Sequence, residues 1–303
     1  MSNLHTAMLE AEAITTKERG QWSMVMTRFF RHRAAVISLV IFVLIVLFAY
    51  IGPFLWKWDY KIHSEIPSWV GPSLDHPFGT DKAGRDMLGA MMQATKQSMN
   101  VALVVAVGST VIGALVGACA GFYRGWVDSV LMRIVDVLFV IPFLVITAAI
   151  AGAIDGGAQW YHMAFILAVF GWLSTARAVR AEVLSLREKE FIEAAKAAGG
   201  SDWHIITKHL IPNTMSVIIV SATLQIAFAI LSETTLSFLG LGIQSPDTSL
   251  GLLIEAAGAS AFNEHWYLFY IPGLMIILIA LTINFIGDGL RDALDPRQTM
   301  VRR

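Results

Sequence analysis

Long runs of apolar residues alternate with polar segments along this chain of 303 residues. A helix needs roughly 20 consecutive apolar residues to cross the core of a bilayer. Six uncharged runs come near that length: residues 34–56, 98–123, 137–154, 156–176, 210–232 and 266–287. Core helices of soluble proteins rarely stay uncharged for more than about 12–14 residues. The pattern therefore predicts an all-α integral membrane protein with six transmembrane helices.

The composition supports a membrane protein and narrows the chemistry available to it. Hydrophobic residues make up 56% of the chain and charged residues 15%, whereas soluble domains carry about 25% charged residues. Cys119 is the only cysteine, so an intrachain disulfide and a cysteine-cluster metal site are both excluded. The first apolar run is too long for the core of a signal peptide and lacks a small-residue cleavage motif. We expect it to remain as a membrane helix.

The positively charged residues are distributed unevenly around the predicted spans. If the N-terminus lies in the cytoplasm, 17 of the 22 lysines and arginines fall on the cytoplasmic side. Cytoplasmic segments of membrane proteins are enriched in lysine and arginine, so this orientation is favoured over its mirror image. It predicts that both termini are cytoplasmic, that loops 57–97 and 241–265 are external, and that loop 178–212 is cytoplasmic.

The predicted organisation is one membrane domain with short polar ends. The segments are a cytoplasmic N-terminal segment at 1–33, a six-helix transmembrane domain at 34–297 and a C-terminal tail at 298–303. Met26, Phe29 and Phe30 share one helical face near several arginines, which is typical of an interfacial helix on an anionic lipid surface. An ordinary basic flank of the first span explains the same residues equally well.

The cytoplasmic loop has the features of a helical hairpin. Residues 182–198 are rich in alanine, lysine and glutamate, which favour a helix, and Gly199 and Gly200 follow as the left-handed turn that ends it. Ser201 or Asp202 can cap a second short helix. A polar hairpin held between two spans has no role in lipid, so we expect it to dock onto a soluble protein.

The spacing within this loop matches a known motif. Glu193-Ala194-Ala195 is followed after three residues by Gly199, and after nine more by His209-x-Ile211-Pro212. This run resembles the coupling loop of ABC importer permeases, usually written E-A-A, three residues, G, nine residues, I-x-L-P. His209 stands where isoleucine is usual. The resemblance implies an ATPase-coupling loop formed by Glu193, Ala194, Ala195, Gly199, Gly200, His209, Ile211 and Pro212.

Three further segments resemble the dipeptide, oligopeptide and nickel branch of that family, in the permease type with the shorter external loop. They are residues 78–86, 233–242 and 287–297. The resemblance implies a type I ABC importer permease fold in a bacterial cytoplasmic membrane. It also implies a second, homologous permease, two ATP-binding subunits and an extracytoplasmic binding protein that delivers di- or oligopeptides.

The sequence contains no recognisable motor or catalytic centre. No Gly-Lys dipeptide occurs, so a phosphate-binding G-x-x-x-x-G-K-[ST] loop is absent, and ATP and Mg²⁺ are expected on the partner subunits. H-E-x-x-H and G-x-S-x-G motifs are absent too. His204 and His209 are five residues apart and would not share a face of an α-helix, so we interpret both as partner-facing rather than metal-binding. These observations favour a transporter subunit without its own cofactor over a membrane enzyme, and nothing indicates nucleic-acid binding.

Two alternatives remain open at this point. Importers of nickel or another small solute share the same permease signatures, so the substrate is not fixed. A secondary transporter driven by an ion gradient would need paired charges within the membrane. Asp136 and Glu233 are the acidic candidates for such pairs, and neither has an obvious cationic partner in the sequence. Glu233 belongs either to the translocation path or at the outer interface, where its carboxylate would reach water.

Three local patterns carry structural expectations. Asp81 is expected to cap the helix that follows it. Gly113, Gly117 and Gly121 are four residues apart, which predicts a close helix contact within the chain or with a second permease. Pro142 lacks a backbone N–H and predicts a kink in the third span.

Overall fold

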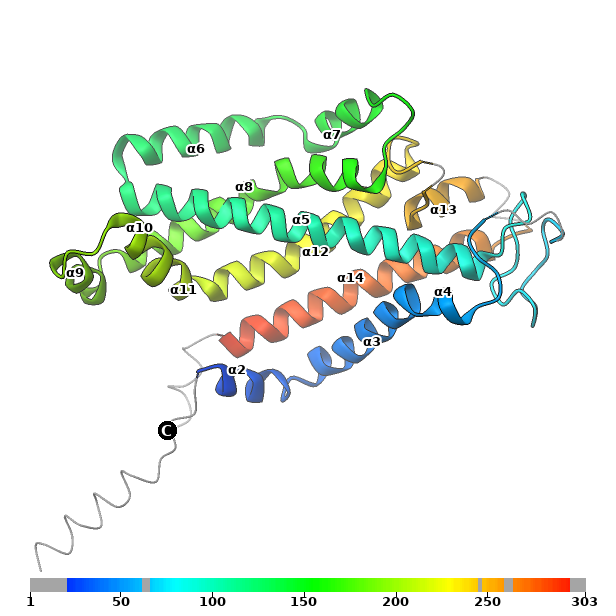
Figure 1. The fold of residues 1–303 in the computed structure, drawn as a ribbon, viewed down its shortest axis with the longest axis horizontal. Coiled ribbons are helices and arrows are strands. Elements are labelled where there is room, and N and C mark those ends of the chain that lie inside the picture. Colours follow the sequence, from blue (N-terminus) through cyan, green and yellow to red (C-terminus); the bar gives the residue numbers. More distant parts are fainter. Residues whose placement is uncertain (1–20, 62–65, 245–246, 259–263, 295–303) are drawn as a thin grey trace, which may run out of the picture.

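The computed structural model describes residues 21–61, 66–244, 247–258 and 264–294, and helices dominate it (Figure 1). The helices are α2 Gln21–Phe29, α3 Arg33–Tyr50, α4 Gly52–Leu55, α5 Met87–Tyr123, α6 Gly125–Val140, α7 Phe143–Gly152, α8 Trp160–Leu186, α9 Glu190–Ala197, α10 Asp202–Ile205, a π-helical turn Ile206–Leu210, α11 Ile211–Asn213, α12 Met215–Phe238, α13 Leu250–Ala257 and α14 Tyr267–Leu294. Within these residues, β-type pairing is limited to two isolated bridges. The all-α prediction is confirmed.

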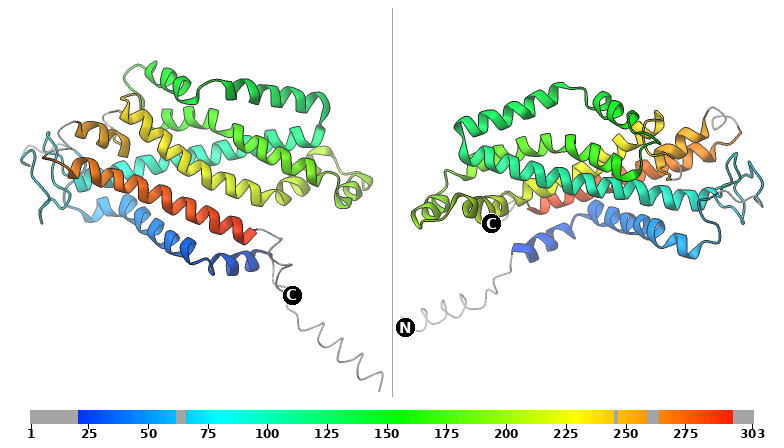
Figure 2. Two further views of the ribbon diagram at one scale, coloured as in Figure 1. Left: turned by 180° about the vertical axis from the view of Figure 1, so that it is seen from behind. Right: turned by 45° about the horizontal axis from the view of Figure 1, so that its top comes forward.

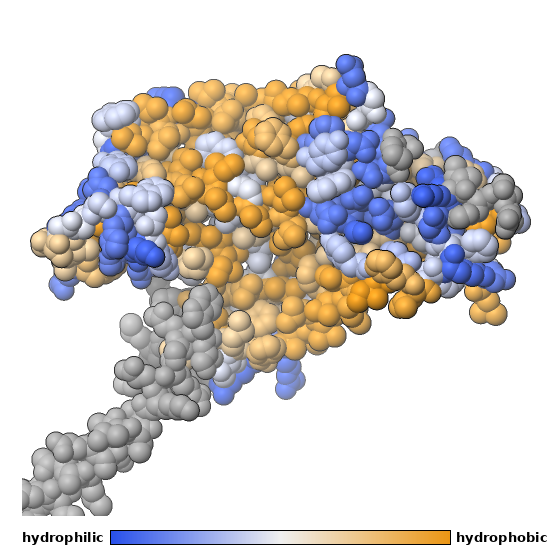
Figure 3. Space-filling view, viewed as in Figure 1, coloured by the Kyte–Doolittle hydropathy of each residue, from blue (hydrophilic) through white to orange (hydrophobic). Residues whose placement is uncertain are grey.

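The long helices lie side by side in one bundle (Figures 1 and 2). Among the described residues, α3, α5, α8, α12 and α14 are long and apolar enough to cross a membrane, and α6 with α7 makes a sixth span if the bent pair counts as one. Figure 3 shows a broad apolar band across the middle, with polar side chains gathered at the two ends. One end carries the elbow, defined as residues 190–205 (α9 and α10). The opposite end carries the cap, defined as residues 66–86 together with α13.

The third predicted span, residues 137–154, is wrong as one straight helix. The helix begins at Gly125 and breaks after Val140, and the axes of α6 and α7 differ by 78°. Pro142 stands at the N-terminus of α7, where its missing N–H and fixed φ are tolerated but an uninterrupted helix is not. The kink predicted at this proline is therefore confirmed, and the bend is large enough to divide the span into two helices.

Two predicted loop boundaries also change. Helix α5 begins at Met87, so the segment 57–97 is not loop throughout. Helix α8 extends to Leu186, beyond the apolar run predicted to end at residue 176 and into the loop predicted at 178–212. The polar start of α5 is packed inside the protein: Gln97 is buried, and its side-chain amide donates to Asp247, just before α13, at 3.2 Å. The external loop predicted at 241–265 contains α13, an apolar helix that packs on α12 and α14.

Glycines bring α5 and α8 into the most extensive helix contact of the bundle. A Cβ atom added to Gly113 would lie 2.8 Å from the Trp172 carbonyl oxygen, and one added to Gly121 would lie 2.8 Å from Val183. Gly117 approaches the α8 backbone in the same way. The glycine stripe therefore marks a contact within the chain, which resolves the two alternatives left by the sequence.

Asp86, and not Asp81, caps α5. Its Oδ2 accepts a hydrogen bond from the Gly89 N–H at 2.8 Å, and its Oδ1 lies 2.8 Å from Nδ1 of the buried His76. Asp81 instead accepts from the N–H groups of its own turn and pairs with Arg85 at 2.7 Å. The prediction for Asp81 was wrong because the chain turns once more before the helix begins.

A helix, α2, precedes the first span, and the apolar side chains expected to share its face lie in two different surroundings. Phe29 is buried and packs with Ala35 and Ala293, so it contacts α14. Met26 and Phe30 remain exposed. Most of the predicted N-terminal segment, at 1–20, and the tail from 295 lie outside the described residues.

Candidate functional site

The elbow is fixed to the bundle by its apolar root, defined as the buried side chains of Ile192, Ile205, Ile206 and Leu210. Ile192 of α9 and Ile205, Ile206 and Leu210 beyond the glycine turn are all fully buried. They form one cluster with residues of α5 and α8, including Val183. Burying each such side chain contributes about 1.5–3 kcal/mol. We therefore expect the elbow to move together with the helices that carry it.

The local sequence explains the shape of the elbow. Gly199 has a φ of +82°, a left-handed conformation that glycine adopts without steric cost, and α9 ends there. Ser201 caps α10, because its Oγ accepts from the His204 N–H at 3.3 Å. The single helix predicted over 182–198 is wrong: α8 ends at Leu186, and the Arg187 guanidinium bonds the Phe122 carbonyl, which holds this corner in place.

The residues of the predicted coupling motif divide into an exposed face and a half-buried support. Glu193, Ala194, Gly199 and Pro212 are exposed, while Ala195, Gly200, His209 and Ile211 are half-buried. Two large aromatic side chains join the exposed face: Trp203 is 58% exposed and Phe191 is 41% exposed. Sequence reasoning missed both, although a tryptophan in a polar hairpin is itself a signal. Exposed aromatic side chains beside small ones are typical of protein-binding surfaces.

His204 and His209 lie on the same face, contrary to the sequence interpretation. Residues Ile206–Leu210 form a π-helical turn, in which residues five apart come into line. The two imidazole centroids are 5.7 Å apart. Two imidazoles are an incomplete metal site, and the described part of the chain holds no group of three or more side chains suited to a metal ion.

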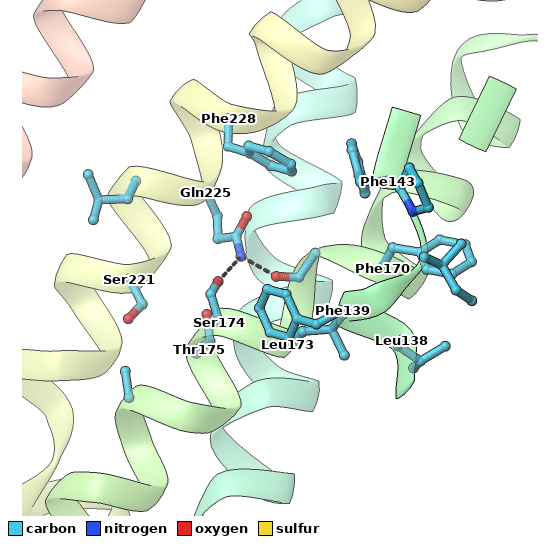
Figure 4. Close-up of a pocket in the computed structure, with 15 residues that line it drawn as sticks. Leu138, Phe139, Phe143, Phe170, Leu173, Ser174, Thr175, Ser221, Gln225 and Phe228 are labelled. Carbon is cyan, nitrogen blue, oxygen red and sulfur yellow. Dashed lines mark hydrogen bonds between the residues drawn. The ribbon is translucent and has the colours of Figure 1, made fainter. Parts of the chain in front are cut away.

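A second candidate site is a cavity of about 640 Å³ between helices of the bundle (Figure 4). It lies where the α6–α7 break, α8 and α12 meet. Its apolar walls are formed mainly by Leu138, Phe139, Ile141, Pro142, Phe143, Phe170, Leu173, Leu224 and Phe228. Its polar side chains are Ser174, Thr175, Ser221 and Gln225. None of the described residues that line it is charged.

Gln225 is the largest polar side chain of this cavity. It is 5% exposed and lies near the middle of α12. Its Nε2 donates to the Gly171 carbonyl and lies 3.5 Å from the Ser174 Oγ (Figure 4). Thr175 is 1% exposed, and its hydroxyl finds no hydrogen-bond partner among the described residues. Sequence reasoning missed this site, and a glutamine inside an apolar run was the available signal.

Glu233 lies inside the protein rather than at an interface. Its side chain is fully buried; Oε1 accepts from the Ser237 hydroxyl at 2.6 Å and Oε2 from the Ser98 hydroxyl at 3.0 Å. The Ser249 hydroxyl, which caps α13, lies 3.2 Å from that of Ser237. The alternative that placed the Glu233 carboxylate in water is therefore wrong. Glu233 does not line the cavity either; its bonds join α5, α12 and α13.

Ion pairs beside the cavity correct another expectation. Asp136 has a cationic partner, because its Oδ1 lies 2.6 Å from the Arg177 guanidinium. Asp128 accepts two hydrogen bonds from Arg180, at 2.5 and 2.6 Å. Both pairs connect α6 to α8, and Arg177 also lies over the Phe139 ring at 4.1 Å. These pairs could not be predicted from the sequence because their members are far apart along the chain.

Sequence comparison identifies the type of protein to which this bundle belongs. Residues 109–300 match the family described as binding-protein-dependent transport system inner membrane component. The chain belongs to this family. Residues 20–68 also match the N-terminal transmembrane domain of oligopeptide transport permease C. The protein is therefore a permease subunit of an ABC importer and not an enzyme, as the motifs predicted, and it is a multi-pass membrane protein.

Known relatives of this permease align over almost their whole length. The oligopeptide transport system permease protein OppC of Mycobacterium tuberculosis strain H37Rv is 42% identical, over 93% of this chain and 96% of that protein. The dipeptide transport system permease protein DppC of Bacillus subtilis strain 168 is 35% identical, over 95% and 89%. An inward-facing structure of the MetNI methionine ABC transporter aligns with a TM-score of 0.57 at 20% identity, over 69% of this chain and 98% of that chain. This structural likeness concerns the fold, and it agrees with the predicted importer permease fold.

Proposed function

We propose that this permease and a second, homologous permease form the membrane path of an ATP-driven importer for di- or oligopeptides. The elbow and both termini face the cytoplasm, where two partner subunits hold ATP and Mg²⁺. A binding protein delivers the peptide to the cap end. Relatives named as oligopeptide and dipeptide permeases support this substrate class, and the charge asymmetry of the loops supports the orientation.

The observation that carries the proposal is the two-sided construction of the elbow. Its inner side is fixed to α5 and α8 by fully buried isoleucines. Its outer side exposes Glu193, one carboxylate suited to a cationic partner, between Phe191 and the alanines, with Trp203 on the next helix. A rigid body that is fixed on one side and docked on the other converts closure of a soluble motor into movement of membrane helices.

Charge reversal at the docking face tests the coupling role. In the assembled transporter, Glu193→Lys is expected to leave membrane insertion intact but to abolish the coupling of uptake to ATP hydrolysis. Gly199→Trp is expected to do the same, because a bulky residue is strained at a φ of +82°. The controls are Asp155→Lys, the same charge change at an exposed residue between α7 and α8, and Gly199→Asn, since asparagine tolerates this conformation.

The readouts are ATP hydrolysis and peptide uptake by the same proteoliposomes. Normal ATP-driven uptake in both Glu193→Lys and Gly199→Trp would contradict the coupling role. The substrate is tested separately with the wild-type transporter, by comparing uptake of a labelled tripeptide with uptake of Ni²⁺. Transport of Ni²⁺ without transport of peptide would replace the proposed substrate and leave the coupling role standing.

A further inference from the structure

We propose that the cavity between α6–α7, α8 and α12 is a transit subsite for an uncharged segment of a peptide, with the Gln225 side-chain amide as its hydrogen-bonding contact. The inference rests on the proposed function, because it assumes that peptides cross the membrane through this permease. It names the cavity and the residue that would contact the substrate, neither of which follows from the coupling role of the elbow.

The first argument is the chemistry of the side chain. A glutamine amide offers both a donor and an acceptor, as a peptide group does. The Nε2 of Gln225 is engaged with the Gly171 carbonyl, whereas its Oε1 has no protein donor among the described residues. That oxygen is available to accept a hydrogen bond from the N–H of a passing peptide.

The second argument is the hydroxyl beside Gln225. Ser174 lines the same cavity, and its Oγ lies 3.5 Å from the Gln225 Nε2. Its side chain is exposed rather than packed between helices. A hydroxyl can both donate and accept a hydrogen bond, so Ser174 adds a second group on this wall that can bond a peptide backbone.

The third argument is the broken helix. Irregular backbone at membrane depth is tolerated where it is buried in protein or lines a cavity, and interrupted helices mark the substrate sites of many transporters. The chain breaks at Ile141 and Pro142, and both residues line this cavity. The break therefore places non-helical backbone on the wall of the cavity that the Gln225 amide also lines.

The walls determine which part of a peptide fits. Phe139, Phe143, Phe170 and Phe228 provide aromatic surfaces, and the lining contains no charged side chain to pair with a peptide terminus. The volume of about 640 Å³ lies within the range of roughly 300–1,000 Å³ that holds small ligands. The cavity thus suits a short segment of peptide with neutral side chains. Contacts to the peptide backbone would hold this segment, with little selection among its side chains.

Photo-crosslinking of a transported peptide tests this location directly. The probe is a neutral-side-chain tripeptide with a central benzoylphenylalanine, supplied with the binding protein and ATP to the reconstituted complex. Irradiation during turnover is expected to give adducts on lining residues such as Phe170 and Phe228. Adducts found solely on the second permease, or outside these helices, would overturn the subsite.

A matched pair of variants tests Gln225. Gln225→Met keeps the length of the side chain and removes its hydrogen bonds, and it is expected to lower kcat/KM for tripeptide uptake roughly 3- to 10-fold. Gln244→Met makes the same change at an exposed glutamine outside the cavity and is expected to behave as wild type. Basal ATP hydrolysis and the thermal midpoint are measured for both, because a merely structural role for Gln225 would alter these as well.

The outcomes separate the two proposals. If the wild-type complex transports the tripeptide while Gln225→Met transports it equally well, the subsite is wrong and the peptide permease proposal stands. If Gln225→Met loses uptake only in step with its thermal midpoint and basal ATP hydrolysis, Gln225 is structural and the subsite is again wrong. If the wild-type complex transports no peptide, the proposed substrate class fails and the subsite fails with it.

Discussion

The elbow and the 66–86 segment of the cap both connect to membrane helices, yet different kinds of contact hold them. The elbow is fixed through buried apolar side chains such as Ile192 and Ile205, and it exposes Trp203. The 66–86 segment is fixed by hydrogen bonds that are satisfied within the chain: Asp86 caps α5, and the Tyr267 hydroxyl lies 3.1 Å from two carbonyl oxygens of this segment.

This difference indicates which end needs another protein to complete it. Buried hydrogen-bonded groups specify a shape without help from a partner. Exposed aromatic side chains in a polar hairpin leave apolar surface uncovered, and such surface marks interaction sites. The elbow is therefore a candidate docking surface, whereas the hydrogen bonds of the 66–86 segment hold that part of the cap in shape within the chain.

The largest expected effect comes from a charge at the root of the elbow. Ile205→Asp places a carboxylate in a fully buried apolar cluster, at a cost of several kcal/mol. We expect the elbow to detach from the bundle and its amides to exchange hydrogen rapidly, measured by hydrogen–deuterium exchange. Trp203→Asp is the control, because this side chain is exposed and its replacement should leave exchange unchanged. Equal protection in both variants would show that the apolar root does not hold the elbow.

The close contact between α5 and α8 is expected to be nearly as sensitive to substitution. A Cβ atom at Gly117 would overlap the Ala176 carbonyl oxygen and lie 3.0 Å from the Arg180 nitrogen, so Gly117→Ala should destabilise the bundle by about 1–3 kcal/mol. Gly108→Ala on the same helix meets only a side-chain carbon at 3.4 Å and should be neutral. Thermal unfolding in detergent distinguishes them, and identical midpoints would refute the close-contact interpretation.

A more local effect is expected at Glu233, which supports the α13 part of the cap. Glu233→Leu would leave the hydroxyls of Ser98 and Ser237 without their acceptor, a loss of about 1–3 kcal/mol confined largely to α13. Glu233→Gln keeps an acceptor and should retain most of the protection. Hydrogen exchange of α13 measures both, and a stable α13 in the leucine variant would mean that apolar packing alone holds it.

The smallest effect is expected at the exposed edge of the cap. The Lys57 ammonium donates to Asp75 at 2.8 Å and lowers the pKa of that carboxyl. A lowered pKa in the folded state means that any stabilisation is present at neutral pH and is lost as the pH falls through that pKa. Because both side chains are exposed, screening by water leaves little of it. We expect Lys57→Ala to leave the thermal midpoint at pH 7 unchanged; a clear decrease would show that surface charge supports the cap.

The features that could be predicted from sequence are those encoded locally. Apolar runs located the membrane helices, and Gly199, Gly200 and Ser201 located the turn and cap of the elbow within a few consecutive residues. Pro142 located the helix break. The coupling role of the motif residues remains a prediction.

The features that were missed depend on residues distant in sequence or on an unusual helix. Asp128 and Asp136 have no cationic partner nearby in the sequence. In the structure they pair with Arg180 and Arg177 of α8. Glu233 looks solvent-facing until Ser98, far earlier in the chain, is found beside it. The histidine pair was misjudged because the π-helical turn changes which residues align.

Helix α5 contains 37 residues, which gives a length of about 55 Å at about 1.5 Å per residue. A bilayer core is only about 30 Å thick. Its first turn is anchored at Asp86, and Phe122 near its last turn belongs to the apolar root of the elbow. The helix is thus longer than a bilayer core is thick, and because it is unbroken, a tilt at one end displaces the other. Under the proposed function, a binding protein docked at the cap and nucleotide bound beside the elbow would both act on this one helix.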